Sequence, residues 1–367
     1  MSDLFNDAAR KAIELRRQLH QIPERSFHET NTKSLLITFL KSETDFEIED
    51  RGPWFYAVKK AQNPIYSPIA FRADMDAVCQ TGAEPGHFCG HDGHCSLMAG
   101  LAAALSKQQL NRDIYLIFQP AEEIGQGATL CRELLKQNGI SEIYGMHNIP
   151  GYPQNTILLR NHTFALASTG LSIRMIGKPS HAAYPEAGNN PALALARLAL
   201  EIERLTDQIN MDGKGLVRMT VVGADIGSDS YGMSASDGTL RLTVRGEPER
   251  LFTDYLQNIR TLAQQTANHD HFILEINEIE RFPATENNPD CTDRLRNAAK
   301  RLGLSVIDLP EPMRWSEDFG YYLQETPGAF FGIGDGETYP QLHTSDFVFP
   351  DEIIETGIRL FAELLGG

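Results

Sequence analysis

The sequence lacks the features of a membrane protein or a secreted protein. It contains no apolar run near the roughly 20 residues that a membrane-spanning helix needs. Residues 1–7 have neither the basic region nor the apolar segment of a secretory signal. The five cysteines are odd in number and scattered, which suits reduced thiols better than a disulfide framework. These absences predict a cytoplasmic protein that does not bind a membrane.

Basic residues are also scarce. The chain has 33 Lys and Arg against 49 Asp and Glu, a formal net charge of -16. Nucleic acids and anionic membranes bind basic surfaces, so neither is expected as the main partner. Hydrophobic residues make up 41% of the 367 residues, which is enough for folded cores. A chain of this length favours two domains over one.

Helical and strand patterns alternate in the first part of the chain and again near its end, which predicts an α/β domain with a mostly parallel central sheet flanked by helices. Between these parts the order changes to β-α-β-β-α-β, typical of a ferredoxin-like domain. We therefore expect one domain in two parts, residues 1–166 and 281–367, with residues 167–280 inserted. The expected helices cover residues 4–19, 30–41, 96–106, 128–137, 191–205, 248–268, 290–302 and 351–365, and the expected strands cover residues 69–73, 114–118, 143–146, 169–176, 216–222, 239–245, 272–279 and 329–333.

The most informative segment is Cys89-Gly90-His91-Asp92-Gly93-His94, a glycine-rich turn with a thiol, two imidazoles and a carboxylate. Each of these groups loses hydration when buried and then needs a partner, which a divalent cation supplies. Thiolate and imidazole suit late first-row divalent ions. We therefore interpret Cys89 and His91 as metal ligands rather than as a buried thiol beside a satisfied histidine. For His94, a supporting or core position is favoured over ligation.

The adjacent pair Glu122-Glu123 follows a predicted strand. Neighbouring residues at a strand end point in different directions, so one carboxylate can hold a metal while the other moves protons. The alternative is a pair of solvated charges that opens a helix. The proximity of other ligand types in the predicted fold favours the functional interpretation, because ligands gather beyond the carboxyl ends of parallel strands.

Four further residues could complete a metal site. His147 and His343 are weak signals alone and gain weight as the additional nitrogen ligands of a binuclear site. Asp74 and Asp76 are either ligands or acceptors that orient His91, and for Asp76 we prefer the second role.

Eight motifs occur in the order of a known family. They resemble the amidohydrolase branch of the aminoacylase/carboxypeptidase family of binuclear metallopeptidases, which includes hippurate hydrolases, auxin-conjugate hydrolases and N-acetyl-diaminopimelate deacetylases. The resemblance covers almost the whole chain. The motifs are Arg16–His20 with Pro23-Glu24, Arg72–Ala77, His87–His94, Phe118–Glu123, Gly145–His147, Ser180–Pro185, Glu317–Phe319 and Leu342-His343.

The resemblance implies two divalent metal ions per subunit, and Zn, Mn, Ni and Co all fit the mixed donor set. Carried across position by position, the metal ligands are Cys89, His91, Glu123, His147 and His343. Glu122 becomes the general base and then the general acid. His181, which otherwise reads as a surface imidazole, matches a histidine that helps to hold the substrate carbonyl oxygen, often from the partner subunit. Asn190 and Arg245 lie near positions that contact the substrate carboxylate.

The implied function is hydrolysis of an N-acyl, N-acetyl-type amino acid to a carboxylate and a free amino acid, in a homodimer or higher homo-oligomer paired through the inserted lid domain. Two alternatives remain: a dipeptidase or carboxypeptidase with the same site, and a non-catalytic metal-binding protein. Glu122 counts against the last, because binding alone does not require it. Segments 179–180, 232–237 and 314–316 depart from the family pattern. None is a metal ligand, so the departures bear on substrate identity more than on reaction type.

Overall fold

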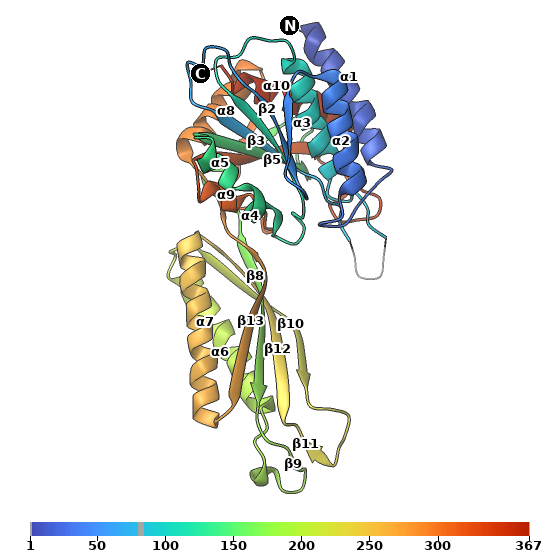
Figure 1. Cartoon of the computed structure of the whole chain (residues 1–367). Helices are drawn as coiled ribbons and strands as arrows, with labels where there is room; N and C mark the ends of the chain where they lie inside the picture. The colour runs from blue at the N-terminus through green and yellow to red at the C-terminus, as the bar shows by residue number, and fades with distance from the viewer. Residues whose placement is uncertain (1, 80–83, 367) are drawn as a thin grey trace. The chain divides into compact units, whose positions relative to one another are not determined.

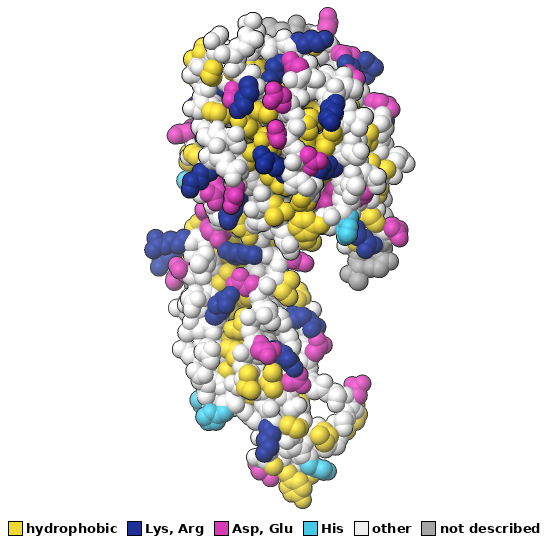
Figure 2. Space-filling view, in the orientation of Figure 1, with side chains coloured by type: hydrophobic (Ala, Val, Ile, Leu, Met, Phe, Trp, Pro, Cys, Tyr) yellow, Lys and Arg dark blue, Asp and Glu magenta, His cyan; other side chains and the backbone are white. Residues whose placement is uncertain are grey.

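The computed structural model describes residues 2–79 and 84–366 and divides into two compact units (Figure 1). None of the described helices has both the length and the apolar character needed to cross a membrane. On the face drawn in Figure 2, acidic and basic side chains are intermixed rather than gathered by sign. Unit 1 comprises Met1–Phe164, Thr285–Pro312 and Asp318–Gly367, and unit 2 comprises Ala165–Ala284 and Met313–Glu317.

A mixed sheet of eight strands lies at the centre of unit 1. Its strands are β1 (Glu47–Asp50), β2 (Phe55–Lys59), β3 (Ile69–Asp74), β4 (Ile114–Gln119), β5 (Glu142–Pro150), β6 (Ile157–Leu159), β15 (Val306–Asp308) and β16 (Gly328–Gly336). Their order is β1-β2-β4-β3-β5-β16-β6-β15. The four central strands β4, β3, β5 and β16 are mutually parallel, and antiparallel pairs lie on both sides of them. The expected α/β fold with a mostly parallel sheet is confirmed.

The sheet of unit 1 is flanked by helices. They are α1 (Ser2–Leu19), α2 (Thr30–Glu43), α3 (His91–Leu105), α4 (Gly127–Cys131), α5 (Glu133–Gln137), α8 (Pro289–Arg301), α9 (Gly320–Leu323) and α10 (Ile354–Glu363), with a short 3-10 turn at Asp351–Ile353. Helix α3 packs against α1, α2, α10 and β3, and 14 of its 15 residues are buried. Because it is covered on all sides, α3 is apolar or small around its whole circumference from Cys95 onward, while its first turn carries His91, Asp92 and His94.

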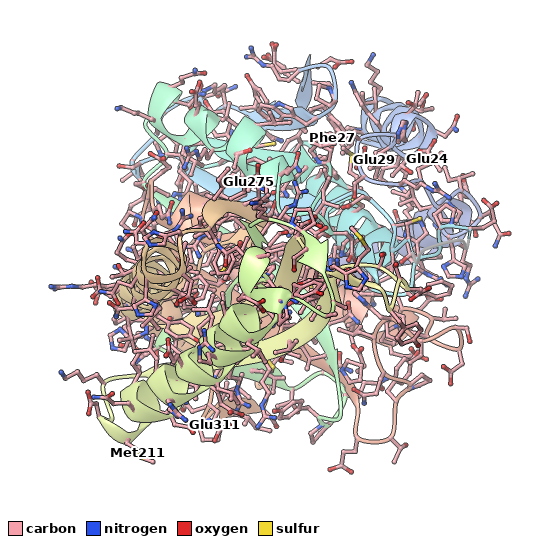
Figure 3. The ribbon with its side chains drawn as sticks, turned by 90° about the horizontal axis from the view of Figure 1, so that it is seen from below. Glu24, Phe27, Glu29, Met211, Glu275 and Glu311 are labelled. Atoms are coloured by element: carbon pink, nitrogen blue, oxygen red, sulfur yellow. The ribbon has the colours of Figure 1, made fainter. Side chains whose placement is uncertain are left out.

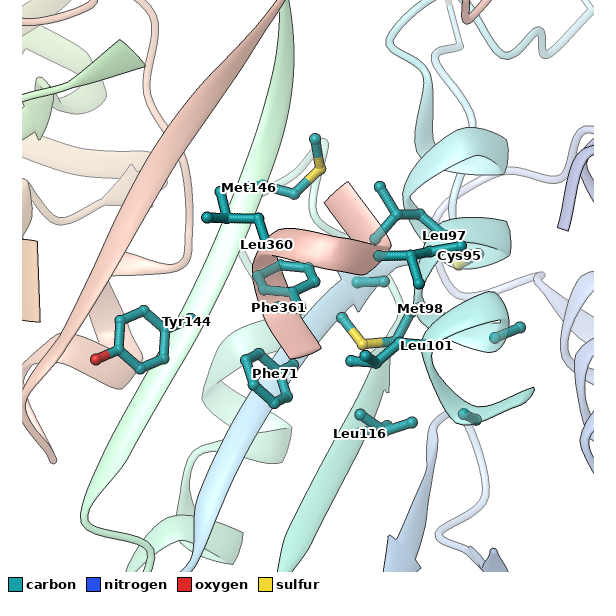
Figure 4. Packing of buried hydrophobic residues seen from close by; sticks show 14 of the residues in the cluster. Phe71, Cys95, Leu97, Met98, Leu101, Leu116, Tyr144, Met146, Leu360 and Phe361 are labelled. Carbon is teal, nitrogen blue, oxygen red and sulfur yellow. The ribbon is translucent and has the colours of Figure 1, made fainter. Parts of the chain in front are cut away.

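The core of unit 1 forms between α3, α10 and the central strands (Figure 4). Phe71 of β3 packs on Phe361 of α10, with ring centroids 4.8 Å apart. All six residues of β3 and all six of β4 are buried. Strands covered on both faces read as continuous apolar runs, which is why the sequence revealed both of them.

Helix α3 begins five residues earlier than expected. The predicted helix over residues 96–106 starts at His91 in the structure, so most of the segment interpreted as a turn is the first turn of the helix. Gly90 precedes it with φ +94°, a conformation that side chains rarely adopt. A Cβ atom on Gly90 would also approach the Asn148 side chain to 2.5 Å. Gly90 therefore allows the sharp turn after which α3 begins at His91, one of the predicted metal ligands.

Other elements also differ from the expectation. The predicted helix over residues 128–137 is two short helices, α4 and α5. Strand β5 continues to Pro150, so His147 lies within the strand instead of after it. Several short strands were not expected, and one reason is visible in β1, where the acidic residues of an exposed edge strand give no apolar pattern. The unexpected strands of unit 1 include β1, β2, β6, β7 (His162–Ala165), β14 (Thr285–Asn287) and β15.

Unit 2 contains a four-stranded antiparallel sheet in the order β10-β12-β8-β13 (Figure 1). In chain order its elements are β8 (Ala167–Ile176), β9 (Ser180–His181), a 3-10 turn at Pro185–Ala187, α6 (Ala192–Met211), β10 (Leu216–Ile226), β11 (Met233–Ser234), β12 (Asp237–Glu247), α7 (Glu249–Asp270) and β13 (Ile273–Phe282). Burial alternates along β12, and α6 and α7 contact the sheet to form a core separate from that of unit 1. The short strands β9 and β11 pair with each other.

Candidate metal centre

Five predicted ligand residues converge in unit 1, near the carboxyl ends of β3, β4 and β5. The Cys89 Sγ atom lies 3.3 Å from His147 Nε2 and 3.3 Å from His343 Nε2. The Glu123 Oε1 atom lies 3.7 Å from His91 Nε2 and 3.7 Å from His343 Nε2. Residues that are as many as 254 positions apart in the chain therefore form one cluster of sulfur, nitrogen and oxygen donors.

Within this cluster, two sets of donor atoms share one residue. Cys89, His91 and His147 form one set, and Cys89, Glu123 and His343 form the other. The donor atoms of each set lie within 4.8 Å of one another. The two sets would supply the ligands of two divalent cations.

The histidines present their Nε2 atoms to the cluster. His91 Nδ1 lies 2.8 Å from the Asp76 carbonyl oxygen, and His147 Nδ1 lies 2.8 Å from the Asn148 carbonyl oxygen. A carbonyl oxygen only accepts, so each Nδ1 donates and each Nε2 keeps its lone pair in the neutral ring. Among the described residues, His91 Nε2 and Glu123 Oε1 are buried without a hydrogen-bond partner. Buried polar atoms without a partner fit coordination to a cation.

Burial sets the electrostatics of this cluster in the protein alone. It raises the pKa of the Cys89 thiol well above its usual value, and the negative charge of Glu123 adds to that effect. Burial likewise raises the pKa of Glu123 to about 7 and lowers the pKa of His147 well below its usual value. In each case burial disfavours the charged form, which is the thiolate of Cys89, the carboxylate of Glu123 and the imidazolium of His147. A divalent cation reverses this balance for a thiol and a carboxylate, because it stabilises their anions.

Asp76 holds the backbone of the Glu122-Glu123 turn. Its Oδ1 atom accepts the Glu122 N–H and its Oδ2 atom accepts the Glu123 N–H, each at 3.0 Å. The Ser26 hydroxyl donates to Asp76 Oδ2 at 2.7 Å. The Asp76 carbonyl oxygen also accepts from His91, so Asp76 is hydrogen-bonded to His91, Glu122 and Glu123. Glu122 itself is 6% exposed, and its Oε2 atom lies 3.9 Å from His91 Nε2.

His94 belongs to a buried network behind the cluster. Its Nδ1 atom lies 2.7 Å from Asp74 Oδ1, and its Nε2 atom lies 2.8 Å from Asn148 Oδ1. Both ring nitrogens are thus engaged, in agreement with a supporting position. The Asn148 amide nitrogen donates in turn to Asp335 Oδ2 at 2.9 Å.

Arg72 joins this network from the other side. It is 2% exposed and donates to Asp74 at 2.7 Å and to Asp318 at 2.8 Å. From the sequence, no role was predicted for Arg72 or Asp318, although they belong to the motifs Arg72–Ala77 and Glu317–Phe319. Arg72 could have been identified from its position inside an apolar strand, because an arginine is buried there only with anionic partners.

His181 and Asn190 lie in unit 2 and border the same short strand. His181 is exposed in β9, pairs with Met233 of β11, and accepts the Ala183 N–H on its Nδ1 atom at 3.0 Å. Asn190 donates to the hydroxyl of Ser234, the other residue of β11, at 3.1 Å. The structure thus places these two residues near one another, while their roles toward a substrate remain predictions.

Arg245 is half-buried on β12 in unit 2. It donates to the Ser316 hydroxyl at 2.7 Å and to the Arg314 carbonyl oxygen at 3.2 Å. Burial lowers the pKa of its guanidinium group. Arg245 is therefore tied to the 314–316 segment, which departs from the pattern of the resembled family. Its predicted contact with a substrate carboxylate remains a prediction.

The buried carboxyl group of Asp335, which accepts from Asn148, should make the stability of the protein depend on pH. It is fully buried at the end of β16, and burial raises its pKa to about 7 from the ordinary 3.8. The folded wild type therefore binds a proton more tightly than the unfolded chain does, and it loses stability as pH rises through this interval. We expect the free energy of unfolding of Asp335→Asn, relative to wild type, to rise by up to about 4 kcal/mol between about pH 4 and pH 8. Urea unfolding at a series of pH values measures this difference, and a constant difference would show that folding does not raise the pKa of Asp335.

Comparison with known proteins is consistent with this geometry. The Peptidase family M20/M25/M40 profile matches residues 70–366. The chain is 31% identical to an N-acetyldiaminopimelate deacetylase of Lacticaseibacillus paracasei over 93% of each chain, and 30% identical to that of Lactobacillus helveticus over 93% of this chain and 92% of the relative. The YXEP protein of Bacillus subtilis, a dinuclear metal binding peptidase from the M20 family, has a TM-score of 0.82 at 26% identity over 98% of both chains. The expected resemblance is confirmed, and this chain belongs to peptidase family M20/M25/M40.

Proposed function

We propose that this chain is a metal-dependent amidohydrolase that cleaves the amide bond of an N-acyl, N-acetyl-type amino acid. Its products would be a carboxylate and a free amino acid. The observation that carries the proposal is the cluster of five donor residues with an additional buried acid, Glu122, beside it. Relatives named N-acetyldiaminopimelate deacetylase support this substrate class.

In this proposal the metal ligands are Cys89, His91, Glu123, His147 and His343, which hold two divalent ions. The unpartnered His91 Nε2 and Glu123 Oε1 atoms support the assignment, and the mixed donors suit Zn, Mn, Ni or Co. When bound, divalent cations supply Lewis acidity, which lowers the pKa of nearby water and polarises a carbonyl group. Asp76 would orient His91 and the turn that carries Glu123.

Glu122 would be the acid–base group. It belongs to neither of the two donor sets that share Cys89, and its backbone N–H is held by Asp76. Its carboxylate would take a proton from the attacking water and then deliver that proton to the leaving amine nitrogen. General acid–base help of this kind contributes about 10²–10⁴ in rate.

The inserted domain would supply the rest of the substrate site. We propose that residues 167–280 form a ferredoxin-like lid, since the strand order and the β-α-β-β-α-β sequence of elements match that arrangement. His181 would hold the substrate carbonyl oxygen, and Asn190 and Arg245 would contact the substrate carboxylate. Two subunits would pair through their lids to form a homodimer, and the protein would be cytoplasmic. Edge strand β10 supports pairing, because it exposes Val221 and Val222, 48% and 59% exposed.

A substrate screen tests the reaction class. We expect the metal-supplemented protein to hydrolyse N-acetyl amino acids, N-acetyldiaminopimelate among them, with a higher kcat/KM than it shows for dipeptides. The reverse order would favour a dipeptidase or carboxypeptidase. Tight metal binding without turnover of either panel would favour a non-catalytic metal-binding protein.

Two variants separate the acid–base role from ligation. Glu122→Ala should keep its bound metal and lose about 10²–10⁴ in kcat, because only proton transfer is removed. Cys89→Ala should lose metal as well as activity, because the thiol belongs to both donor sets. Metal analysis and kinetics on the same preparations measure both effects. Loss of metal from Glu122→Ala would assign that residue to ligation instead.

A mixing experiment tests His181 and the subunit arrangement together. His181→Ala should lower kcat by about 10²–10³, as loss of an oxyanion donor does. Mixed dimers of His181→Ala and Glu122→Ala subunits should then regain activity, because one site would combine the intact Glu122 of one subunit with the intact His181 of the other. Dimers of confirmed composition that stay inactive would show that His181 does not act between subunits.

A further inference from the structure

We propose that Glu29 is a positioning residue for the turn that carries Glu122, an inference that rests on the acid–base role proposed for Glu122. The Glu29 Oε1 atom accepts the N–H of Ala121 at 2.8 Å. The next two N–H groups, those of Glu122 and Glu123, are accepted by Asp76. Three consecutive amides are therefore held by two buried carboxylates, and Glu29 supplies the first contact.

The turn needs such an anchor because its backbone is unusual. Ala121 has φ +53°, in the left-handed region that a residue with a Cβ atom rarely adopts. Its carbonyl oxygen accepts the N–H groups of Gln126 and Gly127 at 3.3 and 3.1 Å. A Cβ atom on Gly127 would lie 1.6 Å from the Pro120 carbonyl oxygen, so the chain closes tightly on itself there. A conformation of this kind persists when its surroundings over-determine it.

Glu29 reaches the turn from the loop between α1 and α2, residues 20–29. This loop makes two other contacts behind the site. The Glu24 carbonyl oxygen accepts the Ala77 N–H at 2.8 Å, and Ser26 donates to Asp76. Figure 3 labels Glu24, Phe27 and Glu29, which lie close to one another. Glu29 is 4% exposed, so its carboxylate is withdrawn from water and directed to the Ala121 amide.

The Glu29 side chain is not used to stabilise its own helix. Glu29 occupies the position before α2 but makes no capping hydrogen bond with its side chain. Glu24 provides that function instead, since its carboxylate accepts the Asn31 N–H at 3.1 Å and the Thr32 N–H at 2.8 Å. The two glutamates of one loop thus have different tasks, helix stabilisation for Glu24 and support of the turn for Glu29.

The contact requires an acceptor more than a charge. Burial and the nearby negative charge of Asp76 raise the pKa of Glu29 to about 7. A glutamine at this position has the same length and a carbonyl oxygen that can accept the Ala121 N–H. Glu29→Gln is therefore expected to preserve the turn, whereas Glu29→Ala removes the acceptor.

The experiment compares Glu29→Ala, Glu29→Gln and Glu24→Ala as metal-loaded proteins on the best N-acetyl amino acid substrate. We expect Glu29→Ala to lower kcat about 10- to 100-fold with little change in KM, because a displaced Glu122 affects proton transfer more than binding. Glu29→Gln should retain most of the wild-type kcat. Glu24→Ala loses only the contacts of the Glu24 carboxylate with Asn31 and Thr32, so it should lower the thermal midpoint and leave kcat near that of wild type.

A second measurement does not depend on turnover. Amide hydrogen exchange by mass spectrometry should show segment 120–127 exchanging more than about tenfold faster in Glu29→Ala than in wild type, and unchanged in Glu24→Ala. An inactive wild type would refute the proposed function and leave this measurement to decide the role of Glu29. Wild-type exchange in Glu29→Ala, or equal loss of kcat in the two alanine variants, would overturn the positioning role.

Discussion

The carboxylate of Asp76 is the contact on which the candidate metal centre depends. It accepts the amides of Glu122 and Glu123, while the carbonyl oxygen of the same residue fixes the ring of His91. One buried acid just beyond β3 therefore determines where a proposed ligand, a proposed acid–base group and an imidazole lie relative to one another. Such a group is stable in the interior because its oxygens are hydrogen-bonded, two of the donors being backbone amides.

A wider polar network supports this arrangement from behind. Arg72 holds Asp74, Asp74 holds His94, and Asn148 links His94 to Asp335. These residues come from β3, α3, β5 and β16, so the network joins the elements that carry His91 and His147. Breaking one partner of a buried ionic network commonly costs about 3–5 kcal/mol, because the other partner is left uncompensated. The interactions that support the site therefore also connect α3 to the strands β3, β5 and β16.

The two units carry different groups of the predicted site residues. Unit 1 contains all five clustered donor residues, and the central strands β3 and β4 of its sheet are buried along their whole length. Unit 2 has its own core between an antiparallel sheet and two helices, and it carries His181, Asn190 and Arg245. In the proposed function this corresponds to chemistry in one unit and substrate recognition in the other. The 314–316 segment, which differs from the family pattern, contacts Arg245, and this is consistent with variation in substrate rather than in reaction.

Much of this organisation was readable from the sequence because its physical causes are local. Continuous apolar runs identified β3 and β4, and a thiol and imidazoles beside glycines identified Cys89 and His91. His343 could not be placed by its surroundings in the chain. In the structure its backbone N–H donates to the Phe88 carbonyl oxygen at 2.8 Å, and this contact with a residue 255 positions earlier in the sequence places it beside Cys89.

The sequence by itself determined the types of donor, the spacing of the motifs and the parallel sheet beneath them. Tertiary structure alone decided that Gly90 starts a helix, that His94 has both nitrogens engaged, and that Glu29 reaches Ala121. The physical reason is that these outcomes depend on acceptors and close contacts contributed by distant segments. Residue type and local pattern specify what a side chain can bind, and packing specifies which partner it meets.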